Sequence, residues 1–245
     1  MYFGSEDKKL YALNATTGAL VWSVTTFGKI YSSPAVADGA VYITETDGTF
    51  GYEWALDGTT GAEITFDNTG FPNLSSPVVA AGTLWIVAGS LNNPLSLLRY
   101  KLTDGYLFST TALGGNGGQD TVPNPTPAVA NGIVYVAYPT GFPGAPNANV
   151  EAFKPTSGGP VSVLWTKTLG DGSFGYGNGV PSSPAIANGI VFVGKGADQV
   201  FCALDATSGD LLWTGLAGSS NGYSSNYSSP AVANGMMYVG GDNRL

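Results

Sequence analysis

The sequence contains no histidine, only one cysteine and few charged residues. Without histidine, His-based acid–base catalysis, Ser-His-Asp and Cys-His nucleophile systems and the common His-ligated metal sites are excluded. The single thiol, Cys202, excludes an internal disulfide framework, and we expect it to pack within a strand. Charged residues make up 11% of the 245 and the net charge is −8, so an extended basic surface for nucleic acid is excluded.

Long apolar runs are also missing. No stretch of about 18 apolar residues occurs, so we expect no membrane-spanning helix. Glycine is abundant, with 36 residues, and serine, threonine and asparagine fill the segments between apolar runs. A surface with few charges and many small polar residues is typical of proteins outside the cytosol, and we expect a secreted, periplasmic or cell-surface location.

What the sequence does contain is one stretch that occurs five times. The copies span residues 33–43, 76–86, 126–136, 183–193 and 229–239, and their prolines are 43, 50, 57 and 46 residues apart. Each copy has a short apolar run, then Asp-Gly or Asn-Gly (Ala81-Gly82 in the second copy), then a β-branched and aromatic run. Such a pair predicts a hairpin with a type I′ turn, because both central residues of that turn need positive φ.

The repeat period predicts the fold class. About four strands fit into each repeat and helical periodicity is absent, so we expect an all-β protein, a β-propeller of four-stranded antiparallel blades in a single domain, 1–245. The expected repeats are 1–30, 31–74, 75–124, 125–181, 182–228 and a partial 229–245. Five to six blades are visible. Met1–Gly4 resembles Met237–Gly240, which indicates a start inside a repeat, and both a five-bladed ring and part of a propeller of up to eight blades stay open.

A second repeated element carries a family resemblance. Ala12–Trp22 and Ala203–Trp213 resemble the A-x-D-x-x-T-G-x-x-x-W repeat of the pyrroloquinoline-quinone (PQQ)-like propellers. Ala55–Thr65 matches up to its glycine and then has threonine in place of tryptophan. With the hairpins, the resemblance covers essentially the whole chain. In that family the tryptophan docks on the neighbouring blade, which implies blade docking for Trp22, Trp165 and Trp213 and turn formation for Asn14, Asp57 and Asp205.

The resemblance also raises the question of a cofactor. Enzymes of this family bind PQQ with calcium or a lanthanide and carry an adjacent-cysteine disulfide, which this sequence cannot form. Calcium needs six to eight oxygen ligands. The candidate carboxylates Glu45, Asp47, Glu53 and Asp120 are scattered over the repeats, and we expect them to be solvated at strand ends. We therefore expect no catalytic residue, no PQQ and no metal, with calcium as the alternative.

The connections between repeats predict a ligand face. Three of them, 114–124, 170–181 and 218–228, should emerge on one face of the propeller around its channel. They combine tyrosine with serine, glycine and asparagine, the composition of adaptable binding loops. Ordinary loops with tyrosines packed over the channel rim are the alternative. The predicted ligand face consists of Asn116, Gln119, Asp120, Phe174, Tyr176, Asn178, Asn221, Tyr223, Asn226 and Tyr227.

These observations predict a non-catalytic propeller that acts as a protein- or glycan-binding scaffold. Within the family the chain resembles the outer-membrane assembly lipoproteins more than the dehydrogenases. Two alternatives stay open: a fragment of a PQQ-dependent dehydrogenase whose cofactor site lies elsewhere, and a structural subunit that self-assembles through unpaired strand edges. Sequons at Asn73 and Asn226 predict N-glycosylation in a secreted host, whereas the sequon at Asn14 lies in a docking turn.

Overall fold

The computed structural model describes a chain built from strands. The described residues are 1–72, 74–90, 93–102, 107–116, 124–140, 147–156, 159–170, 182–195, 200–216 and 228–240. Every secondary-structure element assigned within these residues is a strand, from β1 to β21, so the predicted all-β class is confirmed. Within the same residues, no helix is long and apolar enough to cross a membrane.

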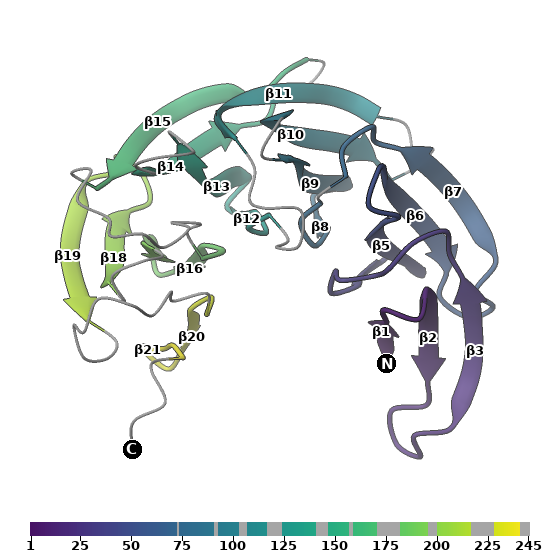
Figure 1. Ribbon diagram of the computed structural model, residues 1–245. Coiled ribbons are helices and arrows are strands. Elements are labelled where there is room, and N and C mark those ends of the chain that lie inside the picture. The colour runs from purple at the N-terminus through teal and green to yellow at the C-terminus, as the bar shows by residue number, and fades with distance from the viewer. Residues whose placement is uncertain are drawn as a thin grey trace. The chain divides into compact units, whose positions relative to one another are not determined.

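The chain forms two compact units, each a series of antiparallel sheets (Figure 1). The first unit is Met1–Leu113 with Gly117–Asn124, and the second is Gly114–Asn116 with Pro125–Leu245. Strands follow one another in chain order within every sheet, as predicted for blades. Among the described residues, four sheets have four strands, the first sheet has three and the last has two.

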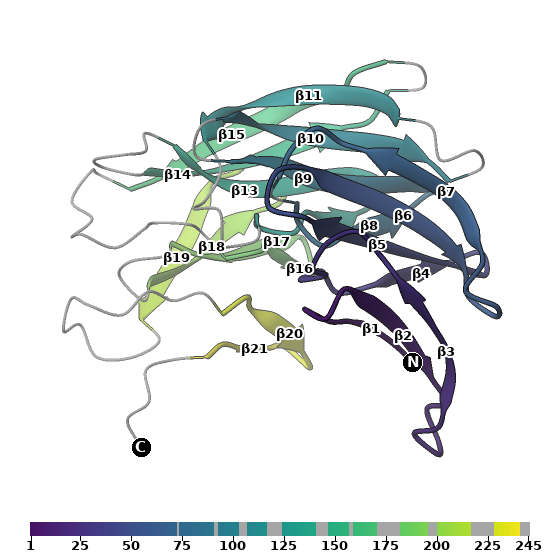
Figure 2. The ribbon, with the colours of Figure 1, turned by 45° about the vertical axis from the view of Figure 1, so that its right-hand side comes forward.

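The first unit contains three sheets. Its strands are β1 (Tyr2–Gly4), β2 (Lys9–Leu13) and β3 (Leu20–Thr25); β4 (Ala35–Ala37), β5 (Ala40–Thr46), β6 (Gly51–Asp57) and β7 (Glu63–Asn68); and β8 (Val78–Ala80), β9 (Thr83–Ser90), β10 (Asn93–Lys101) and β11 (Leu107–Asn116). The short first strands β4 and β8 are neighbours (Figure 2).

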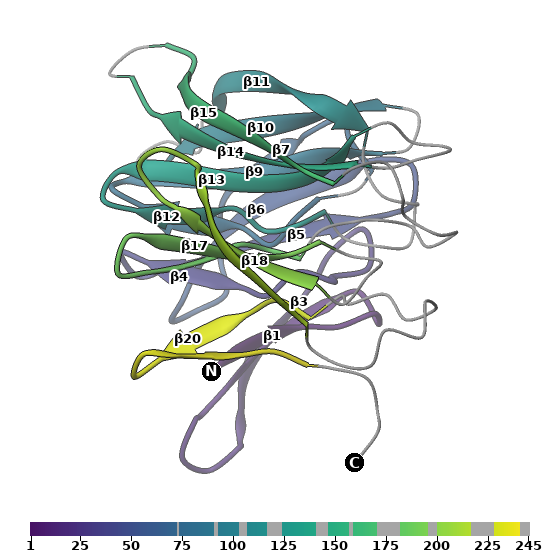
Figure 3. The same ribbon diagram turned by 90° about the vertical axis from the view of Figure 1, so that its left-hand side faces the viewer.

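The second unit also contains three sheets. Its strands are β12 (Ala128–Ala130), β13 (Ile133–Thr140), β14 (Asn147–Lys154) and β15 (Ser162–Leu169); β16 (Ala185–Ala187), β17 (Ile190–Gly194), β18 (Val200–Asp205) and β19 (Leu211–Leu216); and β20 (Ala231–Ala233) and β21 (Met236–Tyr238). The short strands β12, β16 and β20 succeed one another as neighbours in this unit. Figure 3 shows this unit from another side, with β12, β17 and β20 labelled.

The five repeated hairpins have the predicted turn. At Asp38-Gly39 φ is 50° and 81°, and at Asn131-Gly132 it is 51° and 72°. These positive values are those of a type I′ turn, whose twist matches that of the flanking strands. The second copy has the same conformation although Ala81, with φ of 50°, replaces the usual asparagine or aspartate.

Ser-Ser precedes four of the five hairpin prolines, whereas the third copy has Pro125-Thr126, and the contacts of these residues explain why Ser-Ser-Pro recurs. The first serine binds the second strand of its own sheet: Ser32 Oγ donates to Thr44 O at 2.8 Å and accepts from Thr44 N at 3.0 Å. Ser182 Oγ likewise accepts from Gly194 N at 2.8 Å. The first serine therefore fixes the entry of the chain into its sheet wherever Ser-Ser-Pro occurs.

The second serine joins successive sheets. The backbone N–H of Ser33 donates to Ser76 Oγ at 2.9 Å in the first unit. In the second unit Thr126 N donates to Ser183 Oγ at 2.8 Å, and Ser183 N donates to Ser229 Oγ at 3.2 Å. Ser183 uses both its hydroxyl and its N–H, so it links the sheet before it to the sheet after it.

Apolar side chains fill the space between neighbouring sheets. In the first unit Leu10, Ile43 and Leu56 pack between the first and second sheets. In the second unit Val150 and Cys202 belong to one buried cluster between the fourth and fifth sheets. Burial raises the pKa of the Cys202 thiol, and this residue is a packed strand thiol as expected.

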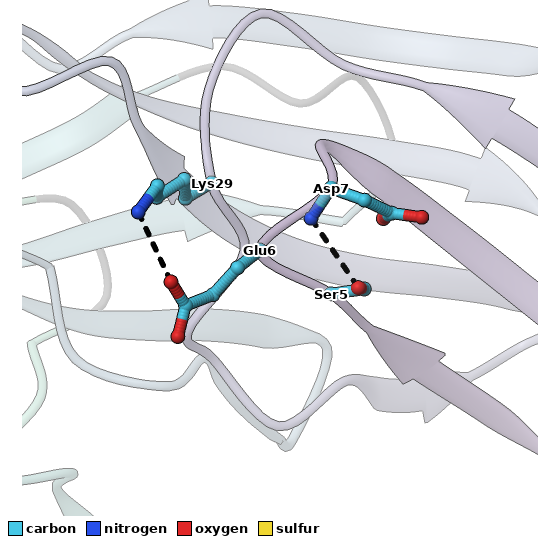
Figure 4. Close-up of polar contacts among 4 residues, drawn as sticks. All are labelled: Ser5, Glu6, Asp7 and Lys29. Carbon is cyan, nitrogen blue, oxygen red and sulfur yellow. Dashed lines mark hydrogen bonds and ion pairs between the residues drawn. The ribbon is translucent and has the colours of Figure 1, made fainter.

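The turn between β1 and β2 shows the polar chemistry of the surface (Figure 4). Ser5 Oγ accepts from the backbone N–H of Asp7 at 3.3 Å. Lys29 Nζ forms an ion pair with Glu6 Oε2 at 3.0 Å, and both side chains are exposed. Exposed pairs of this kind contribute little to stability, so the fold depends on the apolar contacts between sheets.

Candidate functional site

Asn14, Asp57 and Asp205 each begin a turn of the same geometry. In every case the side-chain oxygen accepts the backbone N–H groups two and three residues further on, at 2.7 to 3.0 Å. The turn ends at a glycine in the left-handed conformation, with φ of 70° at Gly18. We call these segments, 14–18, 57–61 and 205–209, the docking turns.

Trp22 docks on the second of these turns. Its indole N–H donates to Gly58 O at 3.2 Å, and the hydroxyl of Tyr2 donates to the same carbonyl at 2.8 Å. A Cβ atom at Gly61 would lie 2.9 Å from the Trp22 ring. The turn therefore needs glycine both for its positive φ and for the close approach of the indole.

Trp165 repeats this arrangement in the second unit. Its indole N–H donates to Ala206 O at 3.0 Å, and Tyr135 donates to the same carbonyl at 3.1 Å. A Cβ atom at Gly209 would lie 2.6 Å from the ring. Trp213 differs, because its side chain lies on the surface near Phe192.

The structure does not describe the predicted ligand face. Asn116 ends β11, but its side chain lies outside the described part, and so do the other nine residues of that face. The sequon residues Asn73 and Asn226 lie outside it as well.

The carboxylates proposed as calcium candidates do not come together. Glu45 lies opposite Tyr52 and Glu53 opposite Thr44 in the β5–β6 ladder, so the two side chains project to opposite faces of the sheet. Asp47 accepts from the backbone N–H groups of Thr49 and Phe50 in a surface turn. Asp120 lies outside the described residues. Among the described residues no group of three or more His, Cys, Asp or Glu could hold a metal ion.

The expectation that these carboxylates are solvated at strand ends is wrong for two of them. Glu45 is 2% exposed and Glu53 is 1% exposed. Both faces of β5 and β6 are covered by neighbouring sheets, so a glutamate on either face is buried. Each is a site of its own, and each has a different set of partners.

Glu45 organises the connection between the first and second sheets. Its Oε1 accepts from the indole N–H of Trp54 at 2.7 Å and from Phe27 N at 3.2 Å, and its Oε2 accepts from Gly28 N at 2.6 Å. Three N–H groups from two segments of the chain therefore converge on this one carboxylate. Glu45 thereby holds the backbone at Phe27 against β6.

Phe27 of this connection packs against three other aromatic rings. We call Phe27, Tyr52, Trp54 and Phe66 the aromatic cluster. The centroid of the Phe27 ring lies 5.4 to 5.5 Å from those of the other three. Trp54 is buried, whereas Phe27 is 56% exposed and Phe66 37% exposed. The cluster thus presents aromatic surface to solvent on a backbone that a buried carboxylate holds in place.

The sequence reasoning missed the aromatic cluster. Tyr52 and Trp54 are two residues apart on one strand, and that alternation was a usable signal. Phe66 joins them through the pairing of Trp54 with Phe66 across β6 and β7, which requires the register. Phe27 comes from a connection for which no strand pattern exists.

Glu53 forms the second buried carboxyl site. It lies opposite Asp67 in the β6–β7 ladder, and Tyr100 of the next sheet donates to Asp67 Oδ2 at 3.1 Å. The Oε2 of Glu53 is buried without a hydrogen-bond partner. Burial, with the nearby charge of Asp67, raises the pKa of Glu53 to about 8. Burial, with the same carboxylate, also raises the pKa of Tyr100.

The comparisons with known proteins agree with this architecture. A family model of PQQ-type repeats, described as outer membrane protein assembly factor BamB, matches residues 1–141 and 146–245. The chain belongs to this family. The resemblance found in the repeats is thereby confirmed.

Two curated relatives match most of the chain. The outer membrane protein assembly factor BamB of Moranella endobia (strain PCIT) is 27% identical over 229 residues, 87% of this chain and 50% of that protein. A tetrathionate hydrolase of Acidithiobacillus ferrooxidans is 27% identical over 216 residues, 84% of this chain and 40% of that protein. The chain spans about half the length of the curated relatives it matches.

Solved structures show the same fold. A europium-containing methanol dehydrogenase superimposes with a TM-score of 0.65 at 16% identity, over 87% of this chain and 48% of that one. The Dos1 propeller superimposes with a TM-score of 0.61 at 14% identity, over 88% of this chain and 55% of that one. These neighbours confirm the β-propeller class, and at such identity they show the fold alone.

Proposed function

We propose that this chain is a non-catalytic, protein-binding propeller scaffold that works in outer membrane protein assembly on the periplasmic side. Membership in the BamB family and the first curated relative support this role. The observation that carries it is the aromatic cluster, which exposes the rings of Phe27 and Phe66 beside the buried Trp54.

The cluster has the physical properties of a protein-binding site. Aromatic side chains contribute large apolar contact areas and dominate interface energies. The Phe27 backbone is already fixed by Glu45, so a partner has less conformational entropy to remove on binding. The Phe27 ring is inclined at 37° to 60° to the other three rings, so the cluster is not a flat platform for the face of a sugar. An apolar protein segment fits this surface better than a glycan.

A direct test uses a defined peptide probe. Strands of outer-membrane barrels alternate apolar and polar residues. A fluorescent 12-residue peptide with that alternation, aromatic at the apolar positions, is titrated with the chain and read by anisotropy; a peptide of the same composition with its aromatic residues grouped at one end is the probe control. We expect Phe27→Ser to weaken binding about tenfold, which corresponds to about 1.4 kcal/mol. Leu164→Ser, which changes an exposed side chain on β15, is the matched protein control.

The outcomes separate this function from the alternatives. Equal affinities of Phe27→Ser and the wild type would overturn the assignment of the cluster as the binding site. One relative is a tetrathionate hydrolase, so a catalytic role of this chain is the alternative that the experiment must test. A titration with PQQ plus calcium therefore accompanies the peptide measurement, and saturable binding of PQQ would overturn the non-catalytic proposal.

A further inference from the structure

Glu53 lies between two rings of the aromatic cluster, on the other face of the same strand. Its neighbours along β6 are Tyr52 and Trp54, and its partner across the ladder is Asp67, which is next to Phe66 on β7. The pairs Glu53–Asp67 and Trp54–Phe66 are therefore adjacent rungs of one ladder, with side chains on opposite faces of the sheet. A change in strand separation at the first rung also changes the distance between Trp54 and Phe66.

Among the described residues, three titratable groups face the Glu53 carboxyl, and none of them is a cation. Asp67 lies opposite on β7, Tyr42 is on the same face of β5, and Tyr100 comes from β10 of the next sheet. Burial raises the pKa of both phenols, so they stay neutral near pH 8. Asp67 is therefore the charge that an ionised Glu53 would meet.

The outer position of β7 lets the sheet respond to that charge. The strand order is β4-β5-β6-β7, so β7 pairs within its sheet with β6 alone. Glu53 Oε2 is buried without a hydrogen-bond partner, and a negative charge on it would be neither solvated nor paired. Like charges directly opposite on two strands destabilise their pairing. Since β7 carries Phe66, its displacement alters the aromatic cluster.

Glu53 titrates near neutral pH in a chain that has no histidine, the usual residue for such a response. Its burial, with the nearby charge of Asp67, raises its pKa to about 8. The one thiol, Cys202, is buried in the second unit, and burial raises its pKa as well. The Glu53 carboxyl therefore changes charge in a pH range in which an ordinary glutamate stays ionised.

We propose that Glu53 is a proton switch for the aromatic cluster, and this proposal rests on the protein-binding function proposed above. With the carboxyl neutral, β6 and β7 keep the spacing that the structure shows, and the cluster binds its partner. When the carboxyl releases its proton to solvent, repulsion from Asp67 moves β7 outward and takes Phe66 away from Trp54 and Phe27. Binding of an apolar segment is therefore strong below the transition and weak above it.

The test measures the affinity of the alternating peptide from pH 6 to 9. The probe has blocked ends, contains only phenylalanine, serine and threonine, and carries a label whose emission is constant over this range. We expect the affinity of the wild type to fall at least about fivefold, the low end of the usual coupling between two sites. Glu53→Gln imitates the neutral acid and should bind at pH 9 as the wild type does at pH 6.

Glu63→Gln, an exposed change on the same outer strand, is the matched control and should follow the wild type. All three proteins have the same amino terminus, so its titration affects them equally. Far-UV circular dichroism at each pH confines the comparison to folded protein. A wild type whose affinity does not change with pH, or an equal decline in Glu53→Gln, would overturn the switch.

A second readout separates the switch from the proposed function. If the wild type binds no peptide at any pH, the binding role of the cluster is wrong, and near-UV circular dichroism of its rings then tests the switch alone. Partial burial and a hydrogen bond to Asp47 raise the pKa of the Tyr52 phenol, so this ring does not titrate in the range. A signal that changes with pH in the wild type and stays constant in Glu53→Gln supports the switch, and an unchanged wild-type signal overturns it.

Discussion

Glu53 lies directly opposite Asp67 in the β6–β7 ladder, and the side chain of Glu53 is buried. The strands that correspond to β6 in the first, third, fourth and fifth sheets are β2, β10, β14 and β18. Their registers place an apolar residue at the position of Glu53 in each: Leu10, Leu97, Val150 and Phe201. This one repeat therefore has an acid where the architecture uses hydrocarbon. An ionised carboxylate there would be desolvated and would face the charge of Asp67, so the neutral form is favoured.

The buried acid makes stability depend on pH. The pKa of Glu53 is about 8 in the folded chain against 4.5 as its ordinary value, so between these values the folded state binds a proton that the unfolded state has lost. The contribution is fully present below pH 4.5 and is lost as pH rises toward 8, a change on the order of 4 kcal/mol. Urea unfolding from pH 5 to 9 should show the decline, and Glu53→Gln should flatten it. Parallel slopes for both proteins would contradict the assignment.

Replacing the acid with the residue type of the other repeats should stabilise the fold. Leucine occupies the equivalent position in the third sheet as Leu97, and it needs no hydrogen-bond partner. Glu53→Leu removes a buried polar atom that has none, a gain of about 1 to 3 kcal/mol at pH 8. Urea midpoints at that pH measure the gain. The exposed change Glu63→Leu on β7 is the control, and an equal gain there would contradict the explanation.

Two glycine variants separate the cost of crowding the indole at a docking turn from the cost of backbone strain. Gly209 and Gly189 have φ of 76° and 75°, so alanine costs about 1 kcal/mol of left-handed strain at either. Only at Gly209 would the new Cβ meet a ring, that of Trp165 at 2.6 Å, and overpacking adds about 1 to 3 kcal/mol. Thermal unfolding should rank Gly209→Ala well below Gly189→Ala. Equal losses would show that the indole moves aside freely.

The repeats, hairpins and blades could be predicted because their signals are local. Asn131-Gly132 encodes its own turn, and Asp57 encodes the turn that ends at Gly61. The buried carboxyl sites could not be predicted, since the alternation along β6 tells which residues share a face and not that both faces are covered. Phe27 is placed by Glu45, which is 18 residues away. No sequence spacing predicts that a residue between two sheets contacts a given strand residue.

The serine links between sheets should carry measurable stability. Ser183 Oγ accepts the N–H of Thr126, and its own N–H donates to Ser229. Ser183→Ala removes only the first of these bonds and leaves the N–H of Thr126 without its acceptor, a loss of about 1 to 2 kcal/mol. Ser23→Ala, an exposed change on β3, is the control. Urea unfolding compares the two, and equal losses would mean that the link between sheets adds nothing.

Glu45 should be needed for binding through its effect on Phe27. Glu45→Gln keeps the shape of the side chain but replaces one accepting oxygen with an amide NH₂, which cannot accept from Trp54, Phe27 or Gly28. One buried N–H then loses its partner, at a cost of about 1 to 3 kcal/mol, and the backbone under Phe27 loosens. We expect lower stability in urea. We also expect weaker binding of the alternating peptide, because binding must then order the backbone under Phe27 and this costs conformational entropy. Glu63→Gln on the exposed surface of β7 is the control. If Glu45→Gln lost stability but bound the peptide as the wild type does, Glu45 would serve the core alone.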